Sequence, residues 1–280
     1  MPPPIVLAQT NAVKALHTAI RDKTASRHQV TTVCIPPSLD TPPPPRRVPL
    51  PSSLPRTSCA RDFLLRDVSH THVCVYCASG CVRFHAPAHR VVLQFVTAAN
   101  RLTRLLIEEA LSHLPATPCT IETPCGPYKG VKLPDESSIC AVSILRAADC
   151  MLGEVRVMMP SVSVGKILIQ RDEATALPAL MYSKLPPDIK SRPVLLLDPM
   201  LATGGSAVMA CKVLVDAGVP AENIIFVNIV CVKEGLAALE AAYPAVKIVT
   251  GAVDPILNEK KYIVPGLGDF GDRYFGTDGM

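Results

Sequence analysis

From about residue 98 onward, apolar runs of strand length alternate with amphipathic stretches of helix length. The apolar runs are Ile139–Leu145, Val162–Ile169, Val194–Leu197, Ile224–Val232 and Val246–Val253. The helical patterns are Asn100–Leu114, Ala207–Ala217 and Lys233–Tyr243. A strand, a helix and a second strand in succession form a right-handed crossover between parallel strands. The order therefore predicts an α/β fold with a mainly parallel central sheet and helices on both faces. Its core would consist mainly of Ala, Val, Ile and Leu, because Trp is absent and aromatic residues make up 4%.

Residues 30–94 interrupt this pattern. The segment has ten of the 28 prolines, five of the 11 cysteines and no Lys or Glu. Runs such as TPPPPRRVPLPSSLP favour polyproline or disordered conformations. Seven Arg and three Asp give the segment the whole formal net charge of +4, so the other residues balance 21 basic against 21 acidic side chains. The bulk charge is therefore no indication of a nucleic-acid partner or of a particular substrate.

Five residues of metal-binding type lie close together inside this segment. They are Cys74, Cys77, Cys81, His85 and His89. Cys-x2-Cys followed by His-x3-His is similar to zinc-ligand spacing, but a zinc finger places about twelve residues between the two pairs. This chain has only seven residues between Cys77 and His85. We therefore interpret the group as incidental composition, with a metal site as the alternative.

The segment PVLLLDPMLATGGSA, residues 193–207, carries the strongest chemical signal. An apolar strand ends at Asp198, and a short loop leads to Thr203, Gly204, Gly205 and Ser206 at the start of a helix. Small residues let backbone N–H groups approach an anion, the hydroxyls add donors, and the helix N-terminus adds positive potential. The motif lacks the Lys of a GxxxxGKS/T loop. It therefore predicts a phosphate cradle that does not hold a nucleoside triphosphate.

The motif DPMLATGGS resembles the phosphoribosyl pyrophosphate loop of the type I phosphoribosyltransferases, and DPM in place of paired acids resembles the uracil phosphoribosyltransferase family in particular. The C-terminal segment YIVPGLGDFGDRYFGTD, residues 262–278, resembles the uracil-binding segment of that family. SILRA, GKILIQRDE and KLPPDI follow the family's order and spacing at residues 143–147, 165–173 and 184–189. The resemblance runs from about Phe95 to the end of the chain.

This resemblance implies transfer of a 5-phosphoribosyl group from phosphoribosyl pyrophosphate, called the donor below, to N1 of uracil, giving UMP and pyrophosphate in pyrimidine salvage. Arg146 and Arg171 would contact the donor, and Asp198 would accept hydrogen bonds from its ribose hydroxyls. Asp269 would face the donor and its bound Mg²⁺, the implied cofactor. Arg171, Asp198 and Asp269 are thus the implied catalytic residues. The implied donor-binding residues are Arg146, Arg171, Asp198, Pro199, Met200, Leu201, Ala202, Thr203, Gly204, Gly205 and Ser206.

One edge of the uracil ring alternates hydrogen-bond acceptors with a donor. Main-chain N–H and C=O groups can recognise such an edge. The resemblance places those groups at Ile263, Gly268, Asp269 and Phe270. Glycines there fit a tight backbone pocket, and a plain Gly-rich connecting loop is the alternative. Residues 178–191 would form a mobile hood over the site, or a plain surface hairpin. One departure is Ala148, which stands where the family has the Gly of RAG and adds a methyl group beside the pyrophosphate site.

The resemblance also predicts the division of the chain. Residues 1–29 resemble the family's N-terminal arm, and residues 95–280 resemble its phosphoribosyltransferase domain. Excising residues 30–94 rejoins RHQ to FVTAANRL in the family's register. The segment begins with Val and ends with Gln, whose codons match the two ends of an intron. We hypothesise that residues 30–94 are a retained intron, and a real lineage-specific loop is the alternative.

Further properties are implied by the resemblance. Relatives form homodimers or homotetramers, some are activated by GTP, and they need neither a nucleic-acid nor a membrane partner. The chain shows no signal-peptide pattern and no apolar run of about 18 residues, so we expect a cytoplasmic protein. Two other functions stay open: a phosphoribosyltransferase for another base, and an inactive or regulatory relative that binds nucleotide without turnover.

Overall fold

The computed structural model describes residues 3–22, 73–77, 80–84, 89–171 and 178–277. The chain divides into two compact units, Met1–Arg27 with Val91–Met280, and His28–Arg90. In the second unit, β2 (Val73–Cys77) and β3 (Gly80–Phe84) pair as an antiparallel hairpin. Most of the segment that we predicted to be disordered lies outside the described residues, as do the side chains considered as metal ligands.

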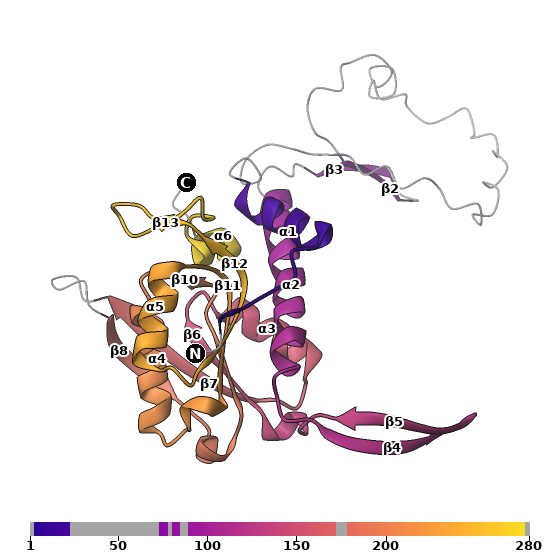
Figure 1. Ribbon diagram of the computed structural model, residues 1–280. Helices are drawn as coiled ribbons and strands as arrows, with labels where there is room; N and C mark the ends of the chain where they lie inside the picture. The colour runs from indigo at the N-terminus through magenta and orange to yellow at the C-terminus, as the bar shows by residue number, and fades with distance from the viewer. Residues whose placement is uncertain (1–2, 23–72, 78–79, 85–88, 172–177, 278–280) are drawn as a thin grey trace, which may run out of the picture. The chain divides into compact units, whose positions relative to one another are not determined.

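The first unit is built on one central sheet (Figure 1). Its strands run in the order β1 (Ile5–Val6), β12 (Lys247–Asp254), β11 (Ile224–Val232), β9 (Val194–Leu197), β6 (Cys140–Leu145), β7 (Ser163–Arg171) and β8 (Pro178–Lys184), with β10 (Met200–Leu201) paired to β11. Every pairing is parallel except that of β7 with β8. The five predicted strands are β6, β7, β9, β11 and β12. The prediction of a mainly parallel sheet is therefore confirmed.

Helices cover both faces of this sheet. One face packs against α1 (Asn11–Arg21), α2 (His89–Leu111) and α3 (Asp149–Met158), and the other packs against α4 (Gly205–Asp216) and α5 (Lys233–Ala242). Successive side chains of β9 point to opposite faces, so Leu195 and Leu197 join the first cluster while Val194 and Leu196 join the second. All four are fully buried. Each contributes about 1.5–3 kcal/mol to folding, which explains why an uninterrupted apolar run forms this strand.

Several elements differ from the sequence-based expectations. We predicted a helix from Asn100, but α2 already begins at His89 and runs across the domain boundary predicted at residue 94. Between Leu114 and Ile139, where we predicted neither a helix nor a strand, β4 (Thr117–Thr123) and β5 (Gly126–Lys132) form a hairpin, which projects from the sheet in Figure 1. Almost every residue of this hairpin is partly or fully exposed, so no buried face creates an alternating pattern. Among the described helices, none is long and apolar enough to cross a membrane.

The remaining elements are short. They are η3 (Glu136–Ser138), η4 (Ile189–Ser191), η5 (Ala221–Asn223), β13 (Ile256–Leu257), β14 (Ile263–Val264) and α6 (Phe270–Phe275). The predicted hood, residues 178–191, consists of the edge strand β8 followed by η4. Strand β8 pairs antiparallel with β7, so this region has a regular position at the edge of the sheet.

Candidate active site

The predicted donor-binding residues meet at one edge of the sheet. Arg146 directly follows β6, Arg171 is the last residue of β7, and Asp198 directly follows β9. These strands are neighbours and run parallel, so their carboxyl ends lie side by side. Ligands of open α/β sheets bind at this edge. Three motifs that are separated in the sequence therefore supply one site, although the side chain of Arg171 lies outside the described part of the chain.

The predicted phosphate cradle is a turn that enters α4. Gly204 adopts the left-handed conformation, with φ of +84°, and is the N-cap of the helix. This conformation is open to glycine without steric cost. The first backbone N–H groups of α4 have no partner within the helix and point toward the preceding turn, where they can bind an anion. Thr203 and Ser206 flank the turn, as the sequence predicts.

A second glycine, which the sequence reasoning missed, holds this turn against α5. A Cβ atom built on Gly235 would lie 2.5 Å from the carbonyl oxygen of Ala202 and 2.8 Å from that of Leu201. A Cβ atom on Gly204 would lie 2.9 Å from the carbonyl oxygen of Gly235. The turn and the first turn of α5 are therefore in direct backbone contact. A glycine inside a helix lowers the stability of the helix by about 1 kcal/mol relative to alanine. The presence of Gly235 in a predicted helix was therefore the signal that could have indicated a special role.

Asp198 lies beside the cradle, and the pKa of its side chain is strongly shifted. It is half-buried, and its Oδ1 accepts a hydrogen bond of 3.3 Å from the backbone N–H of Met200. Burial raises the pKa of Asp198 to about 7, and the hydrogen bond from Met200 opposes that rise. Desolvation makes the charged form of this carboxyl group costly. The carboxylate is thus placed to gain from ligand hydroxyl groups that would donate to it.

This shift predicts how Asp198→Asn alters stability. Between the unfolded pKa of about 4 and the folded pKa of about 7, the native state keeps a proton that the unfolded chain has lost. The contribution of Asp198 to stability is therefore present below pH 4 and is lost as the pH rises to 7. We expect Asp198→Asn to raise the melting temperature of the ligand-free protein at pH 8, with a much smaller gain at pH 5.

Thermal unfolding at the two pH values, followed by circular dichroism, tests this expectation. Asp216→Asn is the matched control, because Asp216 is an exposed helical acid that pairs with Lys212. An Asp198→Asn gain that is the same at both pH values would contradict the proposed ionisation.

The predicted uracil-reading residues lie together in the C-terminal segment, which the structure describes through Thr277. Ile263 is in β14, Gly268 has φ of +80°, and Asp269 is the N-cap of α6. The Oδ1 atom of Asp269 accepts a hydrogen bond of 2.9 Å from the backbone N–H of Asp272, and the side chain is exposed. The ring of Phe270 is 1% exposed and contacts other aromatic rings. Only the main chain of Phe270 is therefore available to a ligand.

An ion pair joins the two halves of the site. Nη2 of Arg146 lies 2.6 Å from Oδ1 of Asp272, and Nη1 donates a hydrogen bond of 3.2 Å to Thr277. Arg146 and the hydroxyl of Thr277 both lower the pKa of the Asp272 carboxyl, with Thr277 the larger cause. The neighbouring Ala148, which stands in place of the family's Gly, is fully buried and has φ of −71°. Its methyl group packs in the core, in a backbone conformation that any residue adopts.

Three comparisons with known proteins bear on this geometry. The family model for uracil phosphoribosyltransferase matches residues 91–277. Uracil phosphoribosyltransferase of Dictyostelium discoideum is 55% identical over 185 residues, which cover 66% of this chain and 85% of that protein. The enzyme of the same name from Saccharomyces cerevisiae is 54% identical over 182 residues, which cover 65% and 83%. The solved structure of the AQ2163 protein from Aquifex aeolicus is 34% identical, with a TM-score of 0.58, covering 66% of this chain and 86% of that chain. The chain therefore belongs to the uracil phosphoribosyltransferase family.

Proposed function

We propose that this protein transfers the 5-phosphoribosyl group of phosphoribosyl pyrophosphate to uracil. In this reaction the bond between C1′ and the pyrophosphate oxygen breaks, a bond forms between C1′ and N1 of uracil, and the N1 proton is lost. The products are UMP and pyrophosphate. The observation that carries the proposal is the family match over residues 91–277, and it is supported by the ion pair that joins Arg146, at the carboxyl edge of the sheet, to Asp272 of the C-terminal segment.

The roles of the residues follow from the charges of the donor. Arg146 and Arg171 bind pyrophosphate oxygens, because a guanidinium group has a fixed charge and a planar fork of donors. Asp198 accepts hydrogen bonds from the ribose hydroxyls, and the backbone from Thr203 to Ser206 holds the 5-phosphate. The reaction passes through an oxocarbenium-like state, so the protein needs no covalent nucleophile. It orients two substrates and stabilises the departing charge.

Mg²⁺ fits the residues at this site. A donor-bound Mg²⁺ neutralises charge on the leaving pyrophosphate. Mg²⁺ is usually held by one or two carboxylates together with substrate phosphates. Asp269 supplies an exposed carboxylate at the start of α6. Within the ranges that the structure describes, no group of three or more His, Cys, Asp and Glu side chains is arranged to hold a metal ion.

Uracil specificity would come from main-chain groups of Ile263, Gly268, Asp269 and Phe270. Backbone N–H and C=O groups match the alternating edge of the ring, and the fixed conformation of the segment sets their spacing. A purine presents a different edge and a larger ring system. The purified protein is expected to form UMP from uracil and donor in the presence of Mg²⁺, measured by chromatography of the nucleotide and by pyrophosphate release. Turnover of hypoxanthine without turnover of uracil would overturn the proposal.

We also propose that residues 30–94 are dispensable for this reaction. The family match covers residues 91–277 and so includes only the last four residues of the segment, and none of the proposed site residues lies in the segment. A variant that joins Gln29 to Phe95 is expected to keep kcat and both KM values within about threefold of the full chain, since distant sites act independently. A loss of uracil turnover in a variant that still unfolds cooperatively would contradict this division of the chain. Sequencing the mature transcript tests the retained-intron hypothesis separately.

Assembly, activation and location are further proposals that the family membership supports. We propose a homodimer or homotetramer, activation by GTP and a cytoplasmic location. Light scattering coupled to size-exclusion chromatography measures the assembly, and uracil turnover with and without GTP measures the activation. A monomer that is fully active and insensitive to GTP would exclude the first two.

A further inference from the structure

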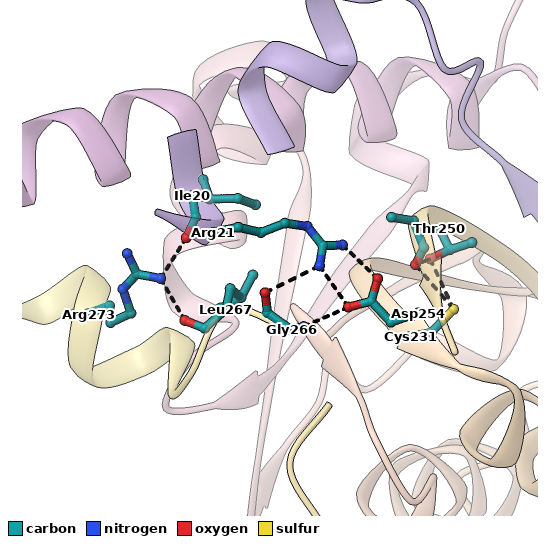
Figure 2. Close-up of polar contacts among 9 residues, drawn as sticks. Ile20, Arg21, Cys231, Thr250, Asp254, Gly266, Leu267 and Arg273 are labelled. Carbon is teal, nitrogen blue, oxygen red and sulfur yellow. Dashed lines mark hydrogen bonds and ion pairs between the residues drawn. The ribbon is translucent and has the colours of Figure 1, made fainter. Parts of the chain in front are cut away.

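The last turn of α1 forms an ion pair with the end of β12, and this pair also binds the backbone of the C-terminal segment (Figure 2). Nη1 and Nη2 of Arg21 donate hydrogen bonds of 2.7 and 2.8 Å to the two carboxylate oxygens of Asp254. Arg21 Nη1 also donates to the carbonyl oxygen of Gly266, at 3.2 Å. The Asp254 carboxylate in turn accepts a hydrogen bond of 2.9 Å from the backbone N–H of Gly266. Both polar groups of Gly266 are therefore held by this one pair.

A second arginine makes the reverse connection. Arg273 of α6 donates from Nη1 to the carbonyl oxygens of Ile20 and Leu267, both at 2.6 Å, as Figure 2 shows. Its Nη2 donates to the carbonyl oxygen of Asp22 at 3.0 Å. The guanidinium lies 4.4 Å from the centre of the Phe95 ring, a cation–π contact. Arg21 thus links the end of α1 directly to Gly266, and Arg273 bridges the end of α1 to Leu267.

These contacts act at the backbone between the uracil-reading positions. Gly266 lies between Ile263 and Gly268 and has φ of +57°. A Cβ atom there would lie 2.1 Å from the carbonyl oxygen of Ile263, so the turn requires glycine and no side chain can anchor it. Its position depends instead on main-chain hydrogen bonds. The Asp254 side chain is 7% exposed and that of Arg21 21% exposed, so water competes weakly for these bonds.

We propose that Arg21 is a positioning residue for uracil: through Asp254 and Gly266, α1 sets the place of the main-chain groups that read the base. The inference rests on the proposed function and adds a determinant outside the C-terminal segment. Arg21 touches neither the phosphate cradle nor Arg146 in the described contacts. Its loss is therefore expected to affect the uracil half of the site more than the phosphate cradle.

The test is steady-state kinetics of Arg21→Ala in the full chain, with uracil and donor varied separately. The KM for uracil is expected to rise about tenfold or more, because a shift of about 1 Å in a positioning contact costs up to a hundredfold. The KM for the donor should stay within about twofold. Ethylguanidinium added to the assay should restore part of the uracil KM, because it replaces the missing fork of donors. An unchanged uracil KM, or an equal rise in both KM values, would overturn the inference.

Two further variants separate positioning from loss of folding. Arg104→Ala is the matched control for Arg21→Ala. It also removes an ion pair between an arginine and a buried carboxylate, because Arg104 binds Glu154 and joins α2 to α3. It is expected to lower the melting temperature while leaving the uracil KM unchanged. If Arg21→Ala does not fold, Arg21→Lys is the alternative, because lysine keeps the positive charge but lacks the planar set of N–H donors. The KM for uracil should then rise less than in Arg21→Ala, and the KM for the donor should not rise. A wild-type protein without uracil turnover would refute the proposed function, whereas an active wild type with an unaffected Arg21 variant refutes only this inference.

Discussion

Replacing Asp198 by asparagine is expected to lower kcat/KM for the donor about a hundredfold, the usual cost of losing one preorganised charged contact in the transition state. The carboxylate lies at the end of β9 beside the phosphate cradle. An amide accepts hydrogen bonds from the ribose hydroxyl groups more weakly than a carboxylate does. It also has no negative charge to stabilise the positive charge of the developing oxocarbenium ion. Initial rates at varied donor concentration and saturating uracil measure the effect.

The stability of the same variant provides the control. Because burial raises the pKa of Asp198 to about 7, the amide should stabilise the ligand-free protein at pH 8. Lost activity in a more stable protein cannot result from unfolding. Asp216→Asn, on the exposed side of α4, is expected to keep full activity. A fully active Asp198→Asn would refute the role assigned to this residue.

Replacing Gly235 by alanine is expected to raise the KM for the donor and to lower kcat, together about a hundredfold in kcat/KM. The new Cβ atom would lie 2.5 Å from the carbonyl oxygen of Ala202, so the backbone of the cradle must move. Because both sides of the contact are backbone, no side-chain rotation relieves it. Overpacking of this kind costs about 1–3 kcal/mol of stability, which denaturant unfolding measures.

Gly153→Ala is the matched control for this variant. Gly153 lies inside α3, and a Cβ atom there meets nothing within 4 Å. Alanine at this helical position should leave the kinetics unchanged and stabilise the protein by about 0.5–1 kcal/mol. The assigned contact between α5 and the cradle would be wrong if Gly235→Ala bound the donor as well as the wild type does.

The buried half of the fold could be predicted from the sequence. Strand β11 has the predicted bounds, Ile224–Val232, because all nine residues are buried and all except Asn228 are apolar. Helix α3 was not predicted, since its apolar positions are broken by Gly153 and charged residues. The β4–β5 hairpin was also missed, because exposed strands carry no apolar alternation.

Some residues of the candidate site could be predicted from the sequence, and others could not. Residues within contiguous motifs, such as Asp198 and Gly204, could be identified from their local pattern. Gly235, Arg21 and Asp254 could not, because their roles arise only when distant segments pack together. Asp272 is a similar case: it lies inside the C-terminal segment, but its partner Arg146 follows a different strand.

The ion pair between Arg146 and Asp272 bears on how the donor would bind. The Arg146 guanidinium, which is proposed to bind pyrophosphate, has the Asp272 carboxylate as its partner in this structure. Under the proposed function, the donor would replace Asp272 as the counter-ion of Arg146 before it is fully bound. An ion pair as exposed as this one is worth about 1 kcal/mol or less, so the exchange reduces donor affinity by less than about tenfold. Under the proposed function, Asp272 would keep the Arg146 guanidinium aligned between turnovers and would release it at a low cost in free energy.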